Sequence, residues 1–254
     1  MQERIREAAN IICQSRQTLA LTGAGISVES GIPDFRSPGG LWEKFDPMEF
    51  GTIQAFRADP EKIWTMLEDV SVLLRRARPN PAHTGLGRLQ EMGLLHTIIT
   101  QNIDSLHQEG GATRVIEYHG NTKTLSCLWC KKRYGADELE GEVPPKCTCG
   151  KILKPDVVFF GESIPLRALQ ESYALASSCQ ALLVLGTSAE VTPANTIPQT
   201  AKAAGAAVIE INVAPTVLTN WLTDIFLQGS ASEVVSQLVQ EVESLIEKES
   251  GARI

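Results

Sequence analysis

Short, continuous apolar runs alternate along this chain with longer segments in which hydrophobic residues recur at helical spacing. Uninterrupted runs, typical of parallel strands buried on both faces, lie at residues 19–21, 94–100, 181–185 and 207–211. Shorter strands are expected at 115–118 and 225–227. Spacings of three and four predict helices near residues 3–15, 61–76, 82–92, 166–178, 194–204 and 232–248. This alternation predicts an α/β fold built on a doubly wound parallel sheet with right-handed crossovers.

Four of the predicted strands end in polar or glycine-containing turns. These turns lie at residues 23–27, 101–104 and 186–188 and at Asn212. Because the carboxyl ends of parallel strands meet at one edge of a sheet, we expect the four turns to line a common ligand site at that edge.

The first of these turns, Thr22-Gly23-Ala24-Gly25-Ile26-Ser27, has the composition of a phosphate-binding loop. Gly23 and Gly25 lack a Cβ atom, so their backbone N–H groups can approach a pyrophosphate, and Ser27 adds a hydroxyl donor. The full dinucleotide fingerprint is absent, because the third glycine is missing and Asp34 follows too early to be the ribose-binding acid. A tight turn without a ligand is the alternative, but the other three turns favour a nucleotide.

Two close pairs of cysteines indicate a metal site. Cys127, Cys130, Cys147 and Cys149 can place four thiolates around one zinc ion at about 2.3 Å. With all four positions taken by sulfur, no position is open for water, so the zinc is expected to be structural. The alternatives are four unrelated buried thiols, or a nucleic-acid-binding ribbon that uses the basic residues 131–133.

Composition limits the class of protein. The chain has 254 residues, of which 43% are hydrophobic and 21% charged, with a net charge of −7. This is ordinary for a globular protein that needs no disulfides, and the negative charge argues against a general nucleic-acid binder. Without an apolar run of spanning length or a secretory signal, we expect a cytoplasmic protein with no membrane partner, and a monomer.

These motifs occur in an order that resembles the sirtuin family of NAD-dependent protein deacylases, and the match spans nearly the whole chain. The residues that carry it are 23–27, 31–36, 101–104, His119-Gly120, the four cysteines, 186–188 and Asn212. The resemblance implies a Rossmann-like domain and a smaller lobe, with NAD and an acylated lysine meeting between them. The Rossmann-like domain would comprise residues 1–37, 79–120 and 154–254. The smaller lobe would comprise a helical insertion, residues 38–78, and a zinc-ribbon module, residues 121–153.

The resemblance also assigns site residues. His119 would be the catalytic base that deprotonates a ribose hydroxyl, assisted by Asn102 and Asp104, and a neutral imidazole in a cleft suits that task. Taken alone, His119 could be an ordinary rim residue, and Asn102 and Asp104 could be turn formers. His83, His96 and His107 are expected to be structural. The residues expected to bind NAD are Gly23, Ala24, Gly25, Ser27, Asp34, Phe35, Arg36, Gln101, Asn102, Ile103, Asp104, Gly186, Thr187, Ser188, Asn212 and Ala231.

The peptide carrying the acylated lysine is expected to bind by strand addition. Its partners on one side would be Val158, Phe160, Gly161 and Glu162, and on the other the loop with Val191 and Pro193. An apolar tunnel lined by Phe35, Val158 and Phe160 would hold the lysine stem, whose charge acylation removes.

One departure from the family bears on the acyl group. Sirtuins that prefer succinyl or malonyl groups carry a Tyr and an Arg where this chain has Leu67 and Val70. Neither side chain can bind a carboxylate, whereas both, with Met66, could line an extended apolar pocket. The sequence therefore predicts a deacetylase or deacylase with weak desuccinylase activity. An ADP-ribosyl transferase and a non-catalytic module that binds NAD or acyl-lysine are the alternatives.

Overall fold

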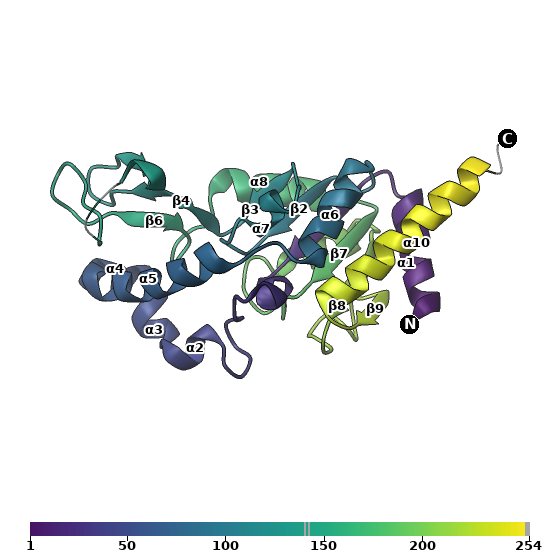
Figure 1. Ribbon diagram of the computed structural model, residues 1–254, viewed down its shortest axis with the longest axis horizontal. Helices are drawn as coiled ribbons and strands as arrows, with labels where there is room; N and C mark the ends of the chain where they lie inside the picture. Colours follow the sequence, from purple (N-terminus) through teal and green to yellow (C-terminus); the bar gives the residue numbers. More distant parts are fainter. Residues whose placement is uncertain (140, 142, 252–254) are drawn as a thin grey trace.

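The larger lobe of the protein is organised around one parallel sheet. The computed structural model describes residues 1–139, 141 and 143–251 (Figure 1). Its six-stranded sheet has the order β3-β2-β1-β7-β8-β9, and every neighbouring pair is parallel. The predicted doubly wound α/β fold is confirmed. The strands are β1 (Thr18–Thr22), β2 (Thr97–Thr100), β3 (Val115–Glu117), β7 (Ala181–Leu185), β8 (Ala207–Asn212) and β9 (Ile225–Gln228).

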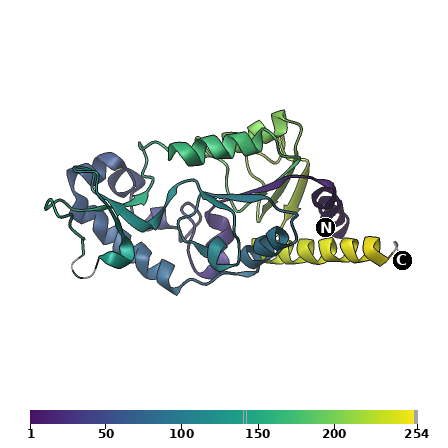
Figure 2. The same ribbon diagram turned by 90° about the horizontal axis from the view of Figure 1, so that it is seen from above.

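Two layers of helices cover the sheet, because successive strand residues face opposite sides. On one side Ala20, Leu183 and Ile209 pack with α1 (Gln2–Gln14), α6 (Pro81–Glu91) and α10 (Ala231–Gly251). On the other, Leu19 and Leu182 pack with α8 (Leu166–Ala176) and α9 (Thr196–Ala203). Figure 2 shows α8 and α10 on opposite sides of the sheet. This burial on both faces explains why the strands are apolar at successive positions.

Two predicted elements differ from the structure. The strand expected at 94–100 begins only at Thr97, because the N–H groups of Leu94 and Leu95 both donate to Leu89 O and close helix α6. The turn at 23–27 continues as a 3₁₀ helix, η1 (Ala24–Ser30), and does not remain an open loop.

The smaller lobe combines two segments that lie far apart in the sequence. The first carries helices α2 (Leu41–Lys44), α3 (Pro47–Phe50), α4 (Ile53–Ala58) and α5 (Pro60–Arg76). The second carries η2 (Ala136–Glu138) and an antiparallel sheet of β4 (Gly120–Ser126), β5 (Arg133–Gly135) and β6 (Lys154–Val157), in the order β5-β4-β6. Trp64 Nε1 donates to Leu153 O at 2.9 Å and links them. Figure 1 shows the two segments together at one end of the molecule.

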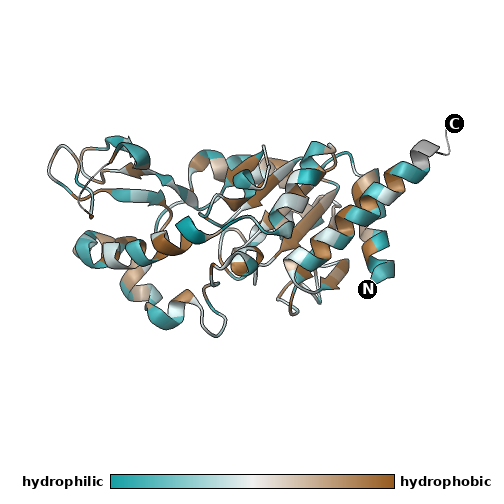
Figure 3. Cartoon of the chain, viewed as in Figure 1, coloured by the Kyte–Doolittle hydropathy of each residue, from teal (hydrophilic) through white to brown (hydrophobic). Residues whose placement is uncertain are grey.

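Hydrophobic residues concentrate in the strands of the parallel sheet and on the helix faces that cover it (Figure 3). A separate apolar cluster, which includes Phe45, Phe56, Ile63 and Phe159, holds the helices of the smaller lobe. No helix in the described part of the chain combines the length and apolar character needed to cross a membrane.

Gly120, at the junction between the lobes, is expected to tolerate no side chain. Its φ is +74°, and an added Cβ atom would overlap the carbonyl oxygen of Asp156 on β6. We expect Gly120→Ala to lower the free energy of unfolding by several kcal/mol, because a steric clash adds to about 1–2 kcal/mol of left-handed backbone strain. Urea unfolding monitored by circular dichroism measures this loss.

Gly205 provides the matched control for this prediction. Its φ is +91°, but nothing lies within 4 Å of an added Cβ atom, so Gly205→Ala carries the backbone strain alone. Equal losses of stability in the two variants would contradict the steric argument.

Candidate functional site

A cleft of about 1030 Å³ lies at the carboxyl ends of the central strands, where the two lobes meet. The four turns expected to converge there do so, since residues of all four line it. The cleft also receives the loop at 34–37, His119 and the segments at 157–162 and 190–193. Every residue predicted from the sequence to bind NAD or peptide, or to act in catalysis, lines this cleft. Their contacts with a ligand stay predictions.

The first turn packs directly against the turn that follows β7. Gly23 N donates to Leu185 O at 3.0 Å, and Gly25 N donates to Gly186 O at 2.8 Å. A Cβ atom on Gly25 would lie 2.8 Å from Gly186 Cα. Glycine is therefore required at these positions by the contact between the two turns. The sequence predicts that the two N–H groups face a phosphate, but both already donate to backbone carbonyl oxygens.

Ser27 is the centre of a polar network at the floor of the cleft. Its Oγ donates to Asp104 Oδ2 at 2.7 Å and accepts from Asn102 Nδ2 at 3.1 Å. Asn102 Nδ2 also lies 3.1 Å from Gly23 O, and Asp104 Oδ1 accepts from Leu106 N at the start of α7 (Leu106–Glu109). Asp104 thus does form a turn. The side chains of Asn102 and Asp104 are also hydrogen-bonded to the first loop.

His83 belongs to the same network, which the sequence did not reveal. The ring is fully buried, and its Nε2 lies 3.4 Å from Ser27 Oγ. Its Nδ1 accepts the N–H of Asn80, so the neutral ring carries its proton on Nε2. Burial lowers the pKa of His83 to about 4, against the opposing charge of Asp104. Asn80-Pro81 signals the start of helix α6 in the sequence, but nothing local signals the contact with Ser27.

His119 is held as a neutral base. Its Nδ1 lies 3.0 Å from the carbonyl oxygen of Gln101, which can only accept, so Nδ1 carries the proton and Nε2 keeps its lone pair. Burial lowers the pKa of His119, and the bond to Gln101 opposes that shift. The ring is therefore neutral at pH 7, with Nε2 available to take a proton.

The segment at 158–162 is tied to both lobes. Val158 N donates to His119 O at 2.8 Å, Phe160 N donates to Gly51 O at 2.8 Å, and Phe160 O accepts from Ile53 N at 3.0 Å. The backbone of Phe160 is thus already paired, so the expectation that the whole segment offers an open edge to a peptide is too broad.

Glu162 has a positioning contact that its sequence context did not predict. Its Oε2 accepts from Phe159 N at 2.9 Å and from Lys154 Nζ at 3.0 Å. Lys154 is almost fully buried, and its Nζ also donates to the carbonyl oxygens of Pro155 and Val157. This ion pair, whose lysine is buried, fixes the shape of the turn at 158–162.

Aromatic side chains form the wall of the cleft next to that turn. Trp42 lies between Phe35 and Phe160, at centroid distances of 5.1 Å and 6.3 Å. The predicted tunnel residues Phe35, Val158 and Phe160 all line the cleft, and helix α5 adds an apolar face made of Met66, Leu67, Val70 and Leu74.

The loop at 34–37 is shaped by Asp34, whose Oδ1 accepts from Arg36 N at 3.0 Å and from Ser37 N at 2.7 Å. Arg36 Nε lies 3.8 Å from Glu190 Oε2, and both residues line the cleft. Asp34 therefore acts on the loop backbone, and Arg36 links the loop to the segment at 190–193.

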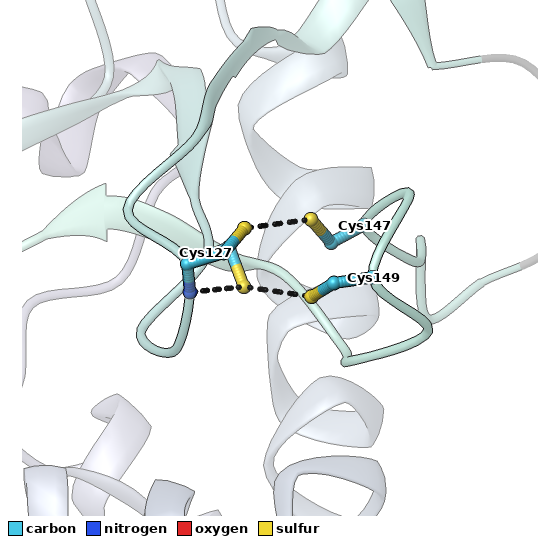
Figure 4. A group of neighbouring side chains, drawn as sticks. Cys127, Cys147 and Cys149 are labelled. Atoms are coloured by element: carbon cyan, nitrogen blue, oxygen red, sulfur yellow. Dashed lines mark hydrogen bonds between the residues drawn. The ribbon is translucent and has the colours of Figure 1, made fainter.

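The four cysteines form a metal site apart from this cleft. Their Sγ atoms all lie within 4.8 Å of one another, with Cys127 3.6 Å from Cys149 and Cys130 3.4 Å from Cys147. Figure 4 shows Cys127, Cys147 and Cys149 pointing toward one another from two loops. A tetrahedral zinc ion with bonds of about 2.3 Å needs sulfurs about 3.8 Å apart, so the residues fit one zinc ion. The alternative of four unrelated thiols is excluded.

The fold and the cleft define a Rossmann-like protein with a neutral histidine in the cleft, and comparison with known proteins gives the family. The Sir2 family model matches residues 23–193. NAD-dependent protein deacylase 2 of Pyrobaculum aerophilum is 46% identical, with 92% of this chain and 94% of that protein covered. NAD-dependent protein deacylase of Pyrococcus furiosus is 42% identical, with coverages of 93% and 97%. The chain belongs to the Sir2, or sirtuin, family.

Solved structures agree with this assignment. A mutant Sir2 homologue in complex with ADP-ribose has a TM-score of 0.91 at 38% identity, with 95% of this chain and 97% of that chain covered. A complex of Sir2 with a p53 peptide and NAD⁺ has a TM-score of 0.84 at 34% identity, with coverages of 92% and 97%. The predicted family is confirmed.

We expect one zinc ion per chain, and we expect its loss to destabilise the smaller lobe. Cys149→Ser removes one ligand at an exposed position, so its main effect is loss of metal affinity. Elemental analysis should find one zinc per wild-type chain and much less in the variant, whose thermal midpoint should fall by several degrees. Cys179→Ser is the control, since Cys179 is buried outside the cluster. Retention of zinc by Cys149→Ser would contradict the four-sulfur site.

Proposed function

We propose that this chain is an NAD-dependent protein-lysine deacylase, which transfers the acyl group of a modified lysine to ADP-ribose and releases nicotinamide. The observation that carries the proposal is the neutral imidazole of His119, fixed in the cleft with Nε2 as the available base. The sirtuin relatives named above as NAD-dependent protein deacylases support it. A non-catalytic binding module would not need such a base.

The cleft residues fit NAD, which supplies the ADP-ribose acceptor and the nicotinamide leaving group. Gly186, Ser188, Asn212 and Ala231 would hold the adenosine half, and Asp34, Phe35 and Arg36 would enclose the pyrophosphate and the nicotinamide ribose. Gln101, Asn102, Ile103 and Asp104 would contact that ribose and the carboxamide. His119 Nε2 would accept a proton from a ribose hydroxyl. The remaining predicted cofactor residues, Gly23, Ala24, Gly25, Ser27 and Thr187, would complete the binding site.

We propose that the peptide lies extended between the turn at 158–162 and the loop at 191–193. Because Phe160 already pairs with the smaller lobe, the carbonyl of Val158 and the backbone of Gly161 are the groups assigned to the peptide on one side. Val191 would pair on the other. The acylated lysine stem would pass Phe35 and Phe160 toward His119. Glu162 would act by holding the turn.

We propose a structural role for the zinc ion, with no part in the chemistry. We also propose the domain division given above: a Rossmann-like domain of residues 1–37, 79–120 and 154–254, a helical insertion at 38–78 and a zinc module at 121–153. Strand β6 at 154–157 departs from that division, because it pairs with β4 in the sheet of the smaller lobe. Residues 140, 142 and 252–254 of those ranges lie outside the described residues. A cytoplasmic monomer that binds neither nucleic acid nor membrane stays part of the proposal.

Nicotinamide release in the presence of NAD and an acetyl-lysine peptide tests the function. Wild-type protein should release nicotinamide only when the peptide is present. His119→Ala should lose at least about 100-fold in kcat, the usual contribution of a general base, while it still binds NAD. His96→Ala, a histidine outside the cleft, is the control. No release would favour a binding module, and release without peptide, with label on protein, would favour an ADP-ribosyl transferase.

The pH dependence of the same assay tests the role of His119. Since burial lowers the pKa of His119, the rise of kcat/KM with pH should be centred below pH 6.5, the ordinary pKa of a histidine. A rise centred above pH 7 would contradict the neutral-base assignment.

The face of helix α5 predicts the acyl preference. Leu67 and Val70 line the cleft and cannot pair with a carboxylate, so a succinyl group would be buried unpaired at a cost of several kcal/mol. We expect acetyl-lysine and longer apolar acyl-lysine peptides to be turned over well, and succinyl-lysine poorly. The double variant Leu67→Tyr with Val70→Arg should gain desuccinylase activity. A wild-type preference for succinyl-lysine would contradict this prediction.

A further inference from the structure

Glu210 is a buried carboxylate that the proposed chemistry does not use. It lies on β8, the neighbour of the edge strand β9, two residues before Asn212, and the residue is 1% exposed. Among the described residues, no ion pair involves Glu210. A carboxylate buried without a cation is costly unless hydrogen-bond donors surround it.

Three threonine hydroxyls supply those donors. Thr216 Oγ1 donates to Glu210 Oε1 at 2.5 Å, while Thr219 Oγ1 and Thr223 Oγ1 donate to Oε2 at 2.9 Å and 2.7 Å. All three threonines belong to the connection between β8 and β9. One buried side chain therefore holds this connection at three points.

Backbone contacts fix the direction of two of these hydroxyls. Thr216 Oγ1 accepts the N–H of Leu218 at 3.1 Å, and Thr219 Oγ1 accepts the N–H of Thr216 at 2.8 Å. Because each oxygen receives a backbone proton, its own proton is directed at Glu210, which can only accept. The chain from backbone N–H through hydroxyl to carboxylate thus determines the backbone shape of the connection.

The same connection forms one wall of the cleft. Residues 213–217 line it next to Asn212, whose Nδ2 donates to Thr187 O at 3.1 Å and whose Oδ1 accepts from Val213 N. Thr223 and Glu210 themselves do not line the cleft. Any effect of Glu210 on a ligand must therefore pass through the loop that it holds.

We propose that Glu210 is a positioning residue for cofactor affinity: through its three threonine donors it sets the loop at 213–217 against the adenosine half of NAD. This rests on the proposed function, since it takes NAD as the ligand of the cleft. The carboxylate acts on one end of the cofactor only. The nicotinamide end, next to His119 and Asn102, and the peptide groove lie on other elements.

Glu210→Gln tests the proposal without changing the size of the side chain. The NH₂ group of glutamine replaces one of the two carboxylate oxygens of Glu210, and it cannot accept a hydroxyl proton. At least one threonine hydroxyl therefore loses its hydrogen bond. The KM for NAD should rise by about 5- to 20-fold, less than the roughly 10- to 160-fold that a hydrogen bond to a charged group is worth, because the loop transmits only part of that loss to the cofactor. The kcat and the KM for peptide should change by less than about 2-fold. Inhibition by ADP-ribose should weaken by a similar factor, and inhibition by nicotinamide should not.

Thr223 provides a milder pair of variants in case Glu210→Gln folds poorly. Thr223→Val removes one donor and should raise the KM for NAD, whereas Thr223→Ser keeps the hydroxyl and should restore the wild-type value. Val242→Ala, which opens a small cavity under α10, is the control for general destabilisation and should leave the ratio of the two KM values unchanged.

Two outcomes would overturn the proposal. One is an unchanged KM for NAD in both Glu210→Gln and Thr223→Val. The other is an equal rise in the KM values for NAD and peptide, as general loosening would produce. Both outcomes are measured as KM values, which requires that the wild-type protein releases nicotinamide with NAD and peptide. Failure of the proposed function would appear separately, as a lack of turnover by the wild-type protein.

Discussion

The close contact between the turns that follow β1 and β7 is the constraint on which the site depends. Gly25 N–H meets Gly186 O at 2.8 Å, and neither position has room for a side chain. This contact brings Ser27 under the ends of β1 and β2, where it meets Asn102 and Asp104. The position of the cleft floor is thus fixed by the ends of the strands. The loop that continues from Ser27 starts at a residue whose position is also fixed.

Much of the large lobe could be predicted from local pattern, because burial on both faces leaves continuous apolar runs such as 181–185 and helices of regular period. The convergence of the four turns follows from the parallel sheet. Contacts that depend on tertiary approach could not be predicted. His83 meets Ser27 across 56 positions, and Trp64 meets Leu153 across 89. Neither contact leaves a periodicity or spacing in the sequence.

Two carboxylates near the cleft, those of Glu162 and Glu210, make contacts that residue type alone does not predict. The sequence predicts only that Glu162 belongs to the segment whose backbone pairs with the peptide, whereas in the structure its carboxylate accepts from Lys154 and from the Phe159 N–H. Glu210 has no cation and is satisfied by hydroxyls instead. In both cases hydrogen bonds to a carboxylate determine the shape of a neighbouring loop, and the local sequence does not show these contacts.

The buried pair of His83 and His107 links the stability of the large lobe to acidity. Their rings lie 5.0 Å apart, and burial lowers their pKa values to about 4 and about 3. In the unfolded chain both would bind protons near pH 6.5, whereas in the folded protein both stay neutral. As pH falls below 6.5, proton binding therefore favours the unfolded state. The free energy of unfolding decreases until the pH reaches the pKa values of the folded rings. The packing that orders the floor of the cleft thus makes this lobe sensitive to acid.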